Sequence, residues 1–225
     1  MVTYSWADLE IPEASLLADL NGISSDFQTA QDLAKKLLAE RAADKPNWSL
    51  SEPFSIAIAV MYSRPFHQGV RHSLGDTDLA ILPPALRQAH DYLWHYRNKH
   101  VAHSVNSFEE NQPRAYYCEE RVKQEGITSI SCGGSRLIGM SVSDLENVIE
   151  LTTFFGAHIG LLIVREQDRL LPIVREMPLE TVLAGGRKAF SGGDRGAVSK
   201  DRKKLAVRKI VRRPARVPRP KRPQI

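Results

Sequence analysis

Residues 96–104 read YRNKHVAHS, and they gather side chains that can bind anions and move protons. Arg97 presents a planar guanidinium fork that matches two oxygens of a phosphate group. Asn98 can donate a further hydrogen bond. His100 and His103 titrate near neutral pH, so each can give or take a proton. These residue types make the stretch a candidate site for phosphate chemistry.

The same stretch also has a purely structural interpretation. Arg, Lys and His are common at the C-terminal end of a helix, because they complement the helix dipole and bond its last carbonyl groups. A histidine on an apolar face often satisfies a buried partner. The residue types alone favour this interpretation, so the surrounding elements have to decide between the two.

The helix that positions these residues is predicted over residues 82–103, with Pro83 and Pro84 suited to its first turn. Its apolar stripe continues directly into the two histidines, which places them on the face that extends the core. Arg97 lies beside the polar end of this stripe, and solvation alone does not explain that placement. The stripe recurs at alternating spacings of four and three: Leu82, Leu86, Ala89, Leu93, Tyr96, His100 and His103.

Arg97 and Asn98, followed by four residues and His103, resemble the R-N-x4-H motif of the HEPN superfamily (higher eukaryote and prokaryote nucleotide-binding domains). The string is most similar to that of bacterial members linked to abortive infection, in which it ends a core helix. As an arrangement of helices the resemblance covers roughly residues 24–175. It is specific over about residues 90–104.

The resemblance implies an all-α, HEPN-like helical bundle and, in active members, metal-independent cleavage of RNA by a dimeric site, with no cofactor. His103 is then the main acid or base, Arg97 the phosphate clamp and Asn98 a positioning residue, while His100 competes with His103 for the proton role. The implied setting is a toxin or phage-defence role, with a homodimer and an antitoxin partner. Other members are non-catalytic binding domains, so a helical interaction module stays open as the alternative.

A loop after residue 66 carries His67, Arg71 and His72, which can approach the same groove and contact RNA together with Lys99. The spacing of the three loop residues equally suits a solvated loop. Motifs of P-loop NTPases, α/β-hydrolases and zincins are absent from the sequence.

Three further helices are predicted around this site. The first covers 24–45 after a break at Asn21-Gly22, with Ser24, Ser25 or Asp26 as its cap. The second starts at Ser51 and ends at Arg64-Pro65, although the apolar run 56–61 also permits a strand. The third begins with a capping box of Ser143 and Glu146 and ends near Leu171, before Pro172. On that helix, His158 is interpreted as a hydrogen-bonded core histidine.

A β-hairpin insertion is predicted at about residues 114–140, turning at 124–126. Such a turn places Cys118 opposite Cys132. Two small reduced side chains on one hairpin face are favoured over a zinc site, because zinc needs more ligands than these.

Charge divides the chain into two parts. Residues 187–225 hold 15 Lys and Arg against two acidic residues, a formal charge of +13, so the remaining chain carries −8. The predicted organisation is a helical domain over 1–186 and a disordered basic tail over 187–225 that contacts nucleic acid phosphates. With two cysteines, no basic leader and no apolar stretch long enough for a bilayer, a cytoplasmic protein without membrane contact is expected.

Overall fold

The computed structural model describes residues 5–102, 109–136 and 139–186, and it divides the chain into two compact units. One unit comprises residues 16–176, and the other joins the residues up to 15 with those from 177 onward. The helices and strands, in chain order, are η1 (Pro12–Ala14), α1 (Ser15–Arg41), η2 (Trp48–Leu50), α2 (Ser51–Ser63), η3 (Arg64–Phe66), α3 (Asp76–Leu79), α4 (Pro84–His95), η4 (Tyr96–Val101), β1 (Glu109–Tyr116), α5 (Val122–Glu125), β2 (Ser129–Arg136), α6 (Val142–Glu176) and α7 (Leu179–Ala184).

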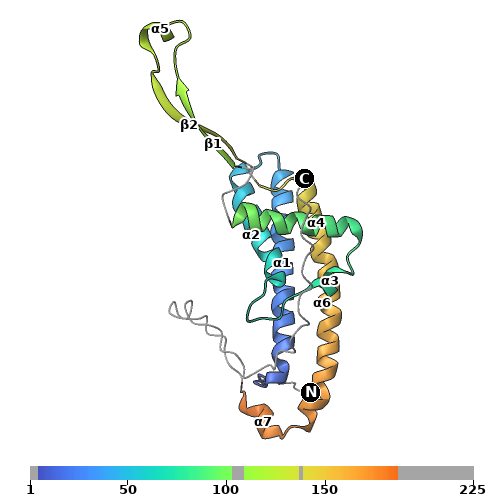
Figure 1. Ribbon diagram of the computed structural model, residues 1–225. Coiled ribbons are helices and arrows are strands. Elements are labelled where there is room, and N and C mark those ends of the chain that lie inside the picture. Colours follow the sequence, from blue (N-terminus) through green and yellow to red (C-terminus); the bar gives the residue numbers. More distant parts are fainter. Residues whose placement is uncertain (1–4, 103–108, 137–138, 187–225) are drawn as a thin grey trace, which may run out of the picture. The chain divides into compact units, whose positions relative to one another are not determined.

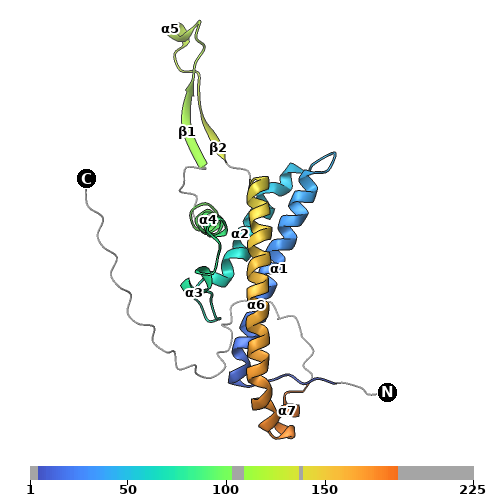
Figure 2. The ribbon, with the colours of Figure 1, turned by 90° about the vertical axis from the view of Figure 1, so that its right-hand side faces the viewer.

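The larger unit is an all-α bundle with one small antiparallel hairpin, as predicted. Helices α1 and α6 lie side by side along much of their length, and α4 runs across them (Figure 1). The view turned by 90° looks nearly along the axis of α4 (Figure 2). Because α4 crosses the bundle, its C-terminal end comes close to α2, and this end carries the polar motif.

The centre of the bundle is aromatic. The rings of Phe27 on α1 and Phe155 on α6 are stacked, with centroids 5.3 Å apart and planes 8° from parallel. Tyr62 and Phe66 complete the cluster at tilted and edge-on angles. Such offset and edge-on ring pairs stabilise a core beyond the effect of their buried area. This cluster joins the C-terminal end of α2 to α1 and α6.

The predicted break at Asn21-Gly22 is wrong, because α1 is one continuous helix. Leu20 and Ile23 on either side of the pair are buried, so tertiary packing outweighs the cost of about 1 kcal/mol that glycine brings to a helix interior. Asn21 also donates from Nδ2 to the carbonyl of Leu17, at 2.8 Å. The capping role suggested for Asp26 is wrong for the same reason, since Asp26 lies in the middle of α1.

Helix α2 confirms the second predicted helix and excludes the strand alternative. Its Ser55 Oγ donates to the carbonyl of Ser51 and accepts from the amide of Met140, at 2.6 and 2.9 Å. Gly139 lies against the same turn with a φ of +91°, and a Cβ there would lie 2.7 Å from the Ser51 carbonyl oxygen. This close contact needs a glycine, and it fixes the chain just before α6.

Helix α6 begins earlier and ends later than predicted. Its capping box is formed by Ser141 and Asp144, because Ser141 Oγ accepts from the Asp144 amide while the Asp144 carboxylate accepts from the Ser141 amide. The prediction of Ser143 and Glu146 was two residues late. Pro172 lies inside the helix rather than after it.

By length and composition, α6 is apolar enough to cross a membrane. Residues 154–164, the longest apolar stretch of the sequence, are too short to span a bilayer, whereas α6 has 35 residues. One face of α6 belongs to the core of the bundle. The buried apolar residues of that face are Leu145, Val148, Leu151, Phe155, Ile159 and Leu170.

The hairpin is confirmed, but its register differs from the prediction. Strand β1 pairs with β2 so that Cys132 lies opposite Pro113 and Tyr116 lies opposite Ser129. The residues between the strands include the short helix α5 instead of a tight turn at 124–126. Cys118 therefore lies beyond the paired strand, and the predicted pairing with Cys132 is wrong.

The smaller unit joins residues near the beginning of the chain to those around α7. The amide of Asp8 donates to the carbonyl of Gly186, at 3.0 Å. Gly185 leaves room for this contact, because a Cβ at that position would collide with the Asp8 carbonyl oxygen. The predicted basic tail, residues 187–225, lies outside the described residues.

Candidate functional site

The motif Arg97–His100 lies in η4, a π-helical turn that directly follows α4. The amide of Ala102 donates to the carbonyl of Arg97, at 3.0 Å, which is the bond between residues five apart that defines a π-turn. The predicted single helix over 82–103 is thus a shorter α-helix with a π-helical end. Such turns occur often at functional sites. His103 lies outside the described residues.

Arg97 is half-buried, and no carboxylate of the described residues pairs with it. Its Nη1 donates to Oδ1 of the neighbouring Asn98, at 2.8 Å. An amide oxygen orients the guanidinium but does not neutralise it, so a partly desolvated positive charge remains at the end of η4. A guanidinium oriented in this way is chemically suited to bind an anion.

His100 and Lys99 occupy other positions of the same turn. The ring of His100 packs against Tyr96, with centroids 4.9 Å apart, while Lys99 is exposed. Tyr96 is almost fully buried, and its hydroxyl has no partner among the described residues. Burial, together with the charges of Glu52 and Asp144 nearby, raises the pKa of Tyr96 to about 12, so the hydroxyl remains a donor at neutral pH.

His67 is the loop residue that the structure brings to α4. Its ring packs on Trp94, with centroids 4.7 Å apart and planes 31° from parallel. Burial, and then the positive charge of Arg97, lower the pKa of His67. His67 Nε2 is enclosed and has no partner among the described residues. His67 is therefore neutral near pH 7, with unused hydrogen-bonding capacity.

A second histidine, His90, also lies near Trp94, with ring centroids 6.5 Å apart. It shares a hydrogen bond of 2.8 Å between Nδ1 and the hydroxyl of Tyr62, and Phe66 covers its ring. Burial lowers the pKa of His90 to about 4. His90 is a core residue, and it supports the Trp94 ring on which His67 packs.

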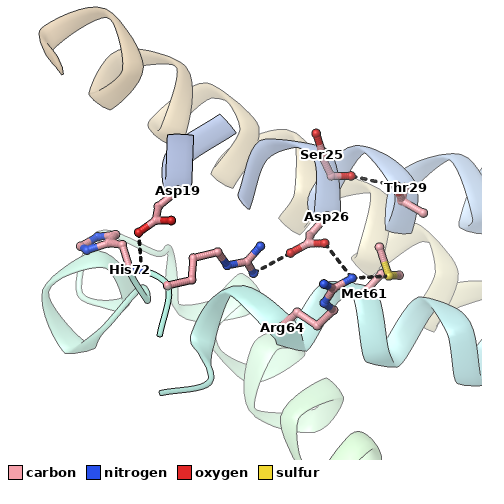
Figure 3. A network of polar contacts seen from close by, with 8 residues as sticks. Asp19, Ser25, Asp26, Thr29, Met61, Arg64 and His72 are labelled. Atoms are coloured by element: carbon pink, nitrogen blue, oxygen red, sulfur yellow. Dashed lines mark hydrogen bonds and ion pairs between the residues drawn. The ribbon is translucent and has the colours of Figure 1, made fainter. Parts of the chain in front are cut away.

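Arg71 and His72, also predicted to bind RNA, are engaged with α1 instead. Asp26 pairs with Arg71 at 2.6 Å and with Arg64 at 3.2 Å, and Asp19 accepts from the backbone amide of His72 at 2.8 Å. Figure 3 shows Asp19 and Asp26 on one face of α1, pointing toward this loop. We call these contacts the α1 clamp. It fixes the loop that carries His67.

The structure thus divides the predicted site residues into two groups. Arg97 and Asn98 share a hydrogen bond in η4 and His67 packs on Trp94 of the preceding turn, whereas Arg71 is held in the α1 clamp. Sequence reasoning missed Trp94, although a tryptophan three residues before Arg97 lies on the same side of a helix. It also missed Asp26, an acidic residue inside an apolar stripe, and such a residue needs a charged partner.

The prediction that His158 of α6 is hydrogen-bonded is confirmed. Its Nε2 lies 3.1 Å from Oδ1 of Asp78, and both side chains are about one-fifth exposed. Within the described ranges, no group of three His, Cys, Asp or Glu side chains is arranged to hold a metal ion. A pocket between α1 and α2, lined by Leu37, Leu50 and Phe54 among others, includes none of the motif residues.

No protein-family model, no curated protein and no solved structure matches this chain significantly.

Proposed function

We propose that this chain is a metal-independent endoribonuclease of the HEPN type, acting in the cytoplasm in a toxin or phage-defence role. One observation carries the proposal: Arg97, in the π-helical turn that begins the R-N-x4-H motif, is half-buried and has no carboxylate partner among the described residues. A positive charge held in this way favours an anionic ligand. The phosphodiester of RNA is the ligand that the motif implies.

Cleavage of RNA through its 2′-hydroxyl needs three contributions from the protein. A base takes the proton of the hydroxyl as its oxygen bonds to phosphorus, and an acid gives a proton to the leaving 5′-oxygen as the P–O bond breaks. A cation stabilises the charge on the phosphorane. Arg97 is the cation in this proposal and Asn98 holds it in place. His103 takes the main proton role, and His100 is its competitor.

The proposed site is completed by a second copy of the chain. One helix end places Arg97 and His103 six positions apart, so that in a regular helix they point about 120° away from each other. Two copies related by a two-fold axis can present two such sets to one groove. The toxin role also implies an antitoxin partner, since a toxin that cleaves RNA has to be held inactive.

The experiment is cleavage of total RNA by the purified chain in the presence of EDTA. The wild type should cleave, and both Arg97→Gln and His103→Ala should lower the rate by about 10²–10³-fold, the usual loss for one transition-state contact. Arg87→Gln on α4, which removes an exposed arginine paired with Asp91, is the matched control and should cleave normally. If wild type leaves RNA intact, or if His103→Ala cuts at the wild-type rate, the proposal is wrong.

A second function rests on the charge of +13 in residues 187–225. In this alternative the chain is a non-catalytic interaction module whose basic tail binds nucleic acid through its phosphates. Removal of residues 187–225 should then weaken RNA binding and flatten its salt dependence. Unchanged affinity at low salt would exclude the tail as the binding element.

A further inference from the structure

The hairpin of β1 and β2 exposes nearly all of its residues to solvent. In the described part of residues 111–134, Cys118 and Gly133 are half-buried and every other residue is exposed. The two strands lie side by side and are joined through α5 (Figure 2). A two-stranded hairpin with neither face covered is only marginally stable in water. Its side chains therefore do not serve a core, and they are accessible to a ligand.

The two faces of the hairpin differ in chemistry. Successive side chains of a strand point to opposite faces of a sheet, so the cross-strand pairs fall into two sets. One set joins large polar residues of β1 to small residues of β2: Gln112 with Gly133, Arg114 with Ser131, and Tyr116 with Ser129. We call this the Tyr116 face. The pairs of the other face are apolar or small: Pro113 with Cys132, and Ala115 with Ile130.

Tyr116 presents an accessible aromatic ring on this face. The residue is 45% exposed, and its cross-strand neighbour, Ser129, is small. The carbonyl of Tyr116 accepts from both the amide and Oγ1 of Thr128, at 2.9 and 3.0 Å, which fixes the end of the strand. An exposed ring on a fixed backbone is a surface on which a nucleobase of any kind can stack.

Arg114 supplies a positive charge two residues before that ring. A Cβ on Gly133 would lie 2.6 Å from Nε of Arg114, so the guanidinium lies over the bare backbone of the partner strand. Arg114 is exposed, and no carboxylate in the described ranges pairs with it. Glu110 lies four positions earlier, about 14 Å along the strand, whereas Tyr116 is only about 7 Å away. The guanidinium can therefore bind the phosphate next to a base stacked on Tyr116.

We propose that the Tyr116 face binds a single strand of RNA, with a base stacked on Tyr116 and the neighbouring phosphate bound by Arg114. The described side chains of this face carry a positive charge and no negative one, which suits a polyanion better than an apolar protein surface. The site lies on a different element from the Arg97 motif and uses none of its residues. The inference rests on the proposed function only because that function identifies the strand as RNA.

The test compares the binding of two short single strands of equal length, oligothymidylate and an abasic oligomer that carries the same phosphates without bases. Neither strand has a 2′-hydroxyl, so the proposed nuclease chemistry does not cleave them. The wild type should bind oligothymidylate more tightly than the abasic strand, by about 5- to 150-fold for one stacked base. Any contact of the basic residues 187–225 with phosphates is the same for both strands, and these residues include a single aromatic one, Phe190.

Three variants show which face of the hairpin is used. Tyr116→Ala should bind the two strands equally, whereas Tyr116→Phe, which keeps the ring, should keep the preference for bases. Ile130→Ser changes a residue of the opposite face that is 78% exposed, and it should bind as the wild type does. Equal binding of both strands by the wild type overturns the inference, as does a preference that survives in Tyr116→Ala. A loss in Ile130→Ser as large as that in Tyr116→Ala overturns it as well, and it identifies the apolar face as a docking surface for a protein.

The role of Arg114 is measured by the dependence of affinity on salt. Arg114→Gln should make the slope of log K against log salt shallower by about 0.7, the value for one phosphate contact of a single strand, whereas Arg114→Lys should keep the slope. Lys35→Gln removes the same charge from α1, where Lys35 donates to Gln31 at 2.8 Å, and it should leave the slope unchanged. An unchanged slope in Arg114→Gln overturns the joint site of Arg114 and Tyr116.

The outcomes separate this inference from the proposed function. A protein that cleaves RNA but binds both test strands equally would keep the nuclease and exclude the hairpin site. A protein that prefers bases through Tyr116 but leaves RNA intact would keep the hairpin site and exclude the nuclease.

Discussion

Two half-buried arginines of this chain, Arg71 and Arg97, lie in opposite electrostatic situations. Arg71 pairs at 2.6 Å with Asp26, whose side chain is only 6% exposed. Arg97 donates to the uncharged Asn98 and has no carboxylate partner among the described residues. The first arginine is neutralised inside the protein and serves the fold. The second has an uncharged partner in the described part of the chain, and this difference separates a candidate binding residue from a structural one.

The two histidines near Trp94 repeat the contrast. His90 is 4% exposed, and its Nδ1 shares a hydrogen bond with the hydroxyl of Tyr62. His67 packs on the same tryptophan with an unpartnered Nε2. Both imidazoles are neutral near pH 7 because burial lowers their pKa values. The difference is the partner, since Nδ1 of His90 has one and Nε2 of His67 has none among the described residues.

The largest expected effect comes from removing the carboxylate of the α1 clamp. Asp26→Asn should lower the free energy of unfolding by about 3 kcal/mol, because it leaves the charge of the partly buried Arg71 without its partner. The loss lies at the low end of the range for buried ion pairs, because Arg64, the second partner of Asp26, is 53% exposed. Urea unfolding monitored by circular dichroism measures the change.

Glu125→Gln is the control for this variant. It removes the pair of Glu125 with Arg121, which has the same 2.6 Å separation but side chains that are 39% and 60% exposed. The expected loss is about 0.5 kcal/mol or less. Equal losses for the two variants would show that the α1 clamp does not stabilise the fold more than a surface pair does.

Much of this fold follows from local sequence. Apolar spacing predicts that 51–63 and the residues after 141 are helices, because an amphipathic face has to be buried whatever its partner is. The errors fall where tertiary contacts override a local signal. Buried Leu20 and Ile23 carry α1 through Asn21-Gly22, and strand register places Cys132 opposite Pro113 instead of Cys118.

The site could be predicted only in part, for a related reason. The types and spacing of Arg97 and Asn98 mark them as candidates, but the same argument marks Arg71. What separates the two arginines is Asp26, which lies 45 positions before Arg71 in the sequence. Local patterns do not show which carboxylate meets which arginine. The contact of His67 with Trp94 is equally non-local.

The next expected effect concerns His90 and the pH dependence of stability. Its pKa falls from an ordinary 6.5 to about 4 on folding, so the unfolded chain binds the proton more tightly. The contribution of His90 to the free energy of unfolding is therefore fully present above pH 6.5. It decreases as the pH falls, and about 3 kcal/mol has been lost once the pH is below 4.

His90→Gln isolates this contribution, because glutamine can still bond the Tyr62 hydroxyl but does not titrate. The difference in unfolding free energy between the wild type and His90→Gln should change by about 3 kcal/mol between pH 7 and pH 4. His67→Gln is the comparison variant, and its change should have the same sign. A difference that is constant with pH for His90→Gln would mean that His90 is not buried in its neutral form.

A smaller effect should follow from converting the unpaired arginine into a paired one. Asn98→Asp places a carboxylate where an amide oxygen already accepts from Arg97 Nη1, at 2.8 Å. Thermal unfolding should show a gain of about 1 kcal/mol or less, the usual value of a partly exposed pair. The same variant should lose the proposed RNA cleavage, because its own carboxylate occupies the guanidinium. A variant that cleaves as fast as the wild type would remove the comparison between Arg71 and Arg97.

The smallest expected effects are electrostatic, and they test whether each arginine acts on its own histidine. The charge of Arg97 lowers the pKa of His67, and the charge of Arg87 lowers the pKa of His90. Arg97→Gln should therefore raise the pKa of His67 and leave His90 unchanged, whereas Arg87→Gln should do the reverse. NMR titration of the two imidazoles in both variants measures the four responses. If Arg97→Gln leaves the His67 titration unchanged, the guanidinium does not act on His67, and Arg97 and His67 are separate features of the fold.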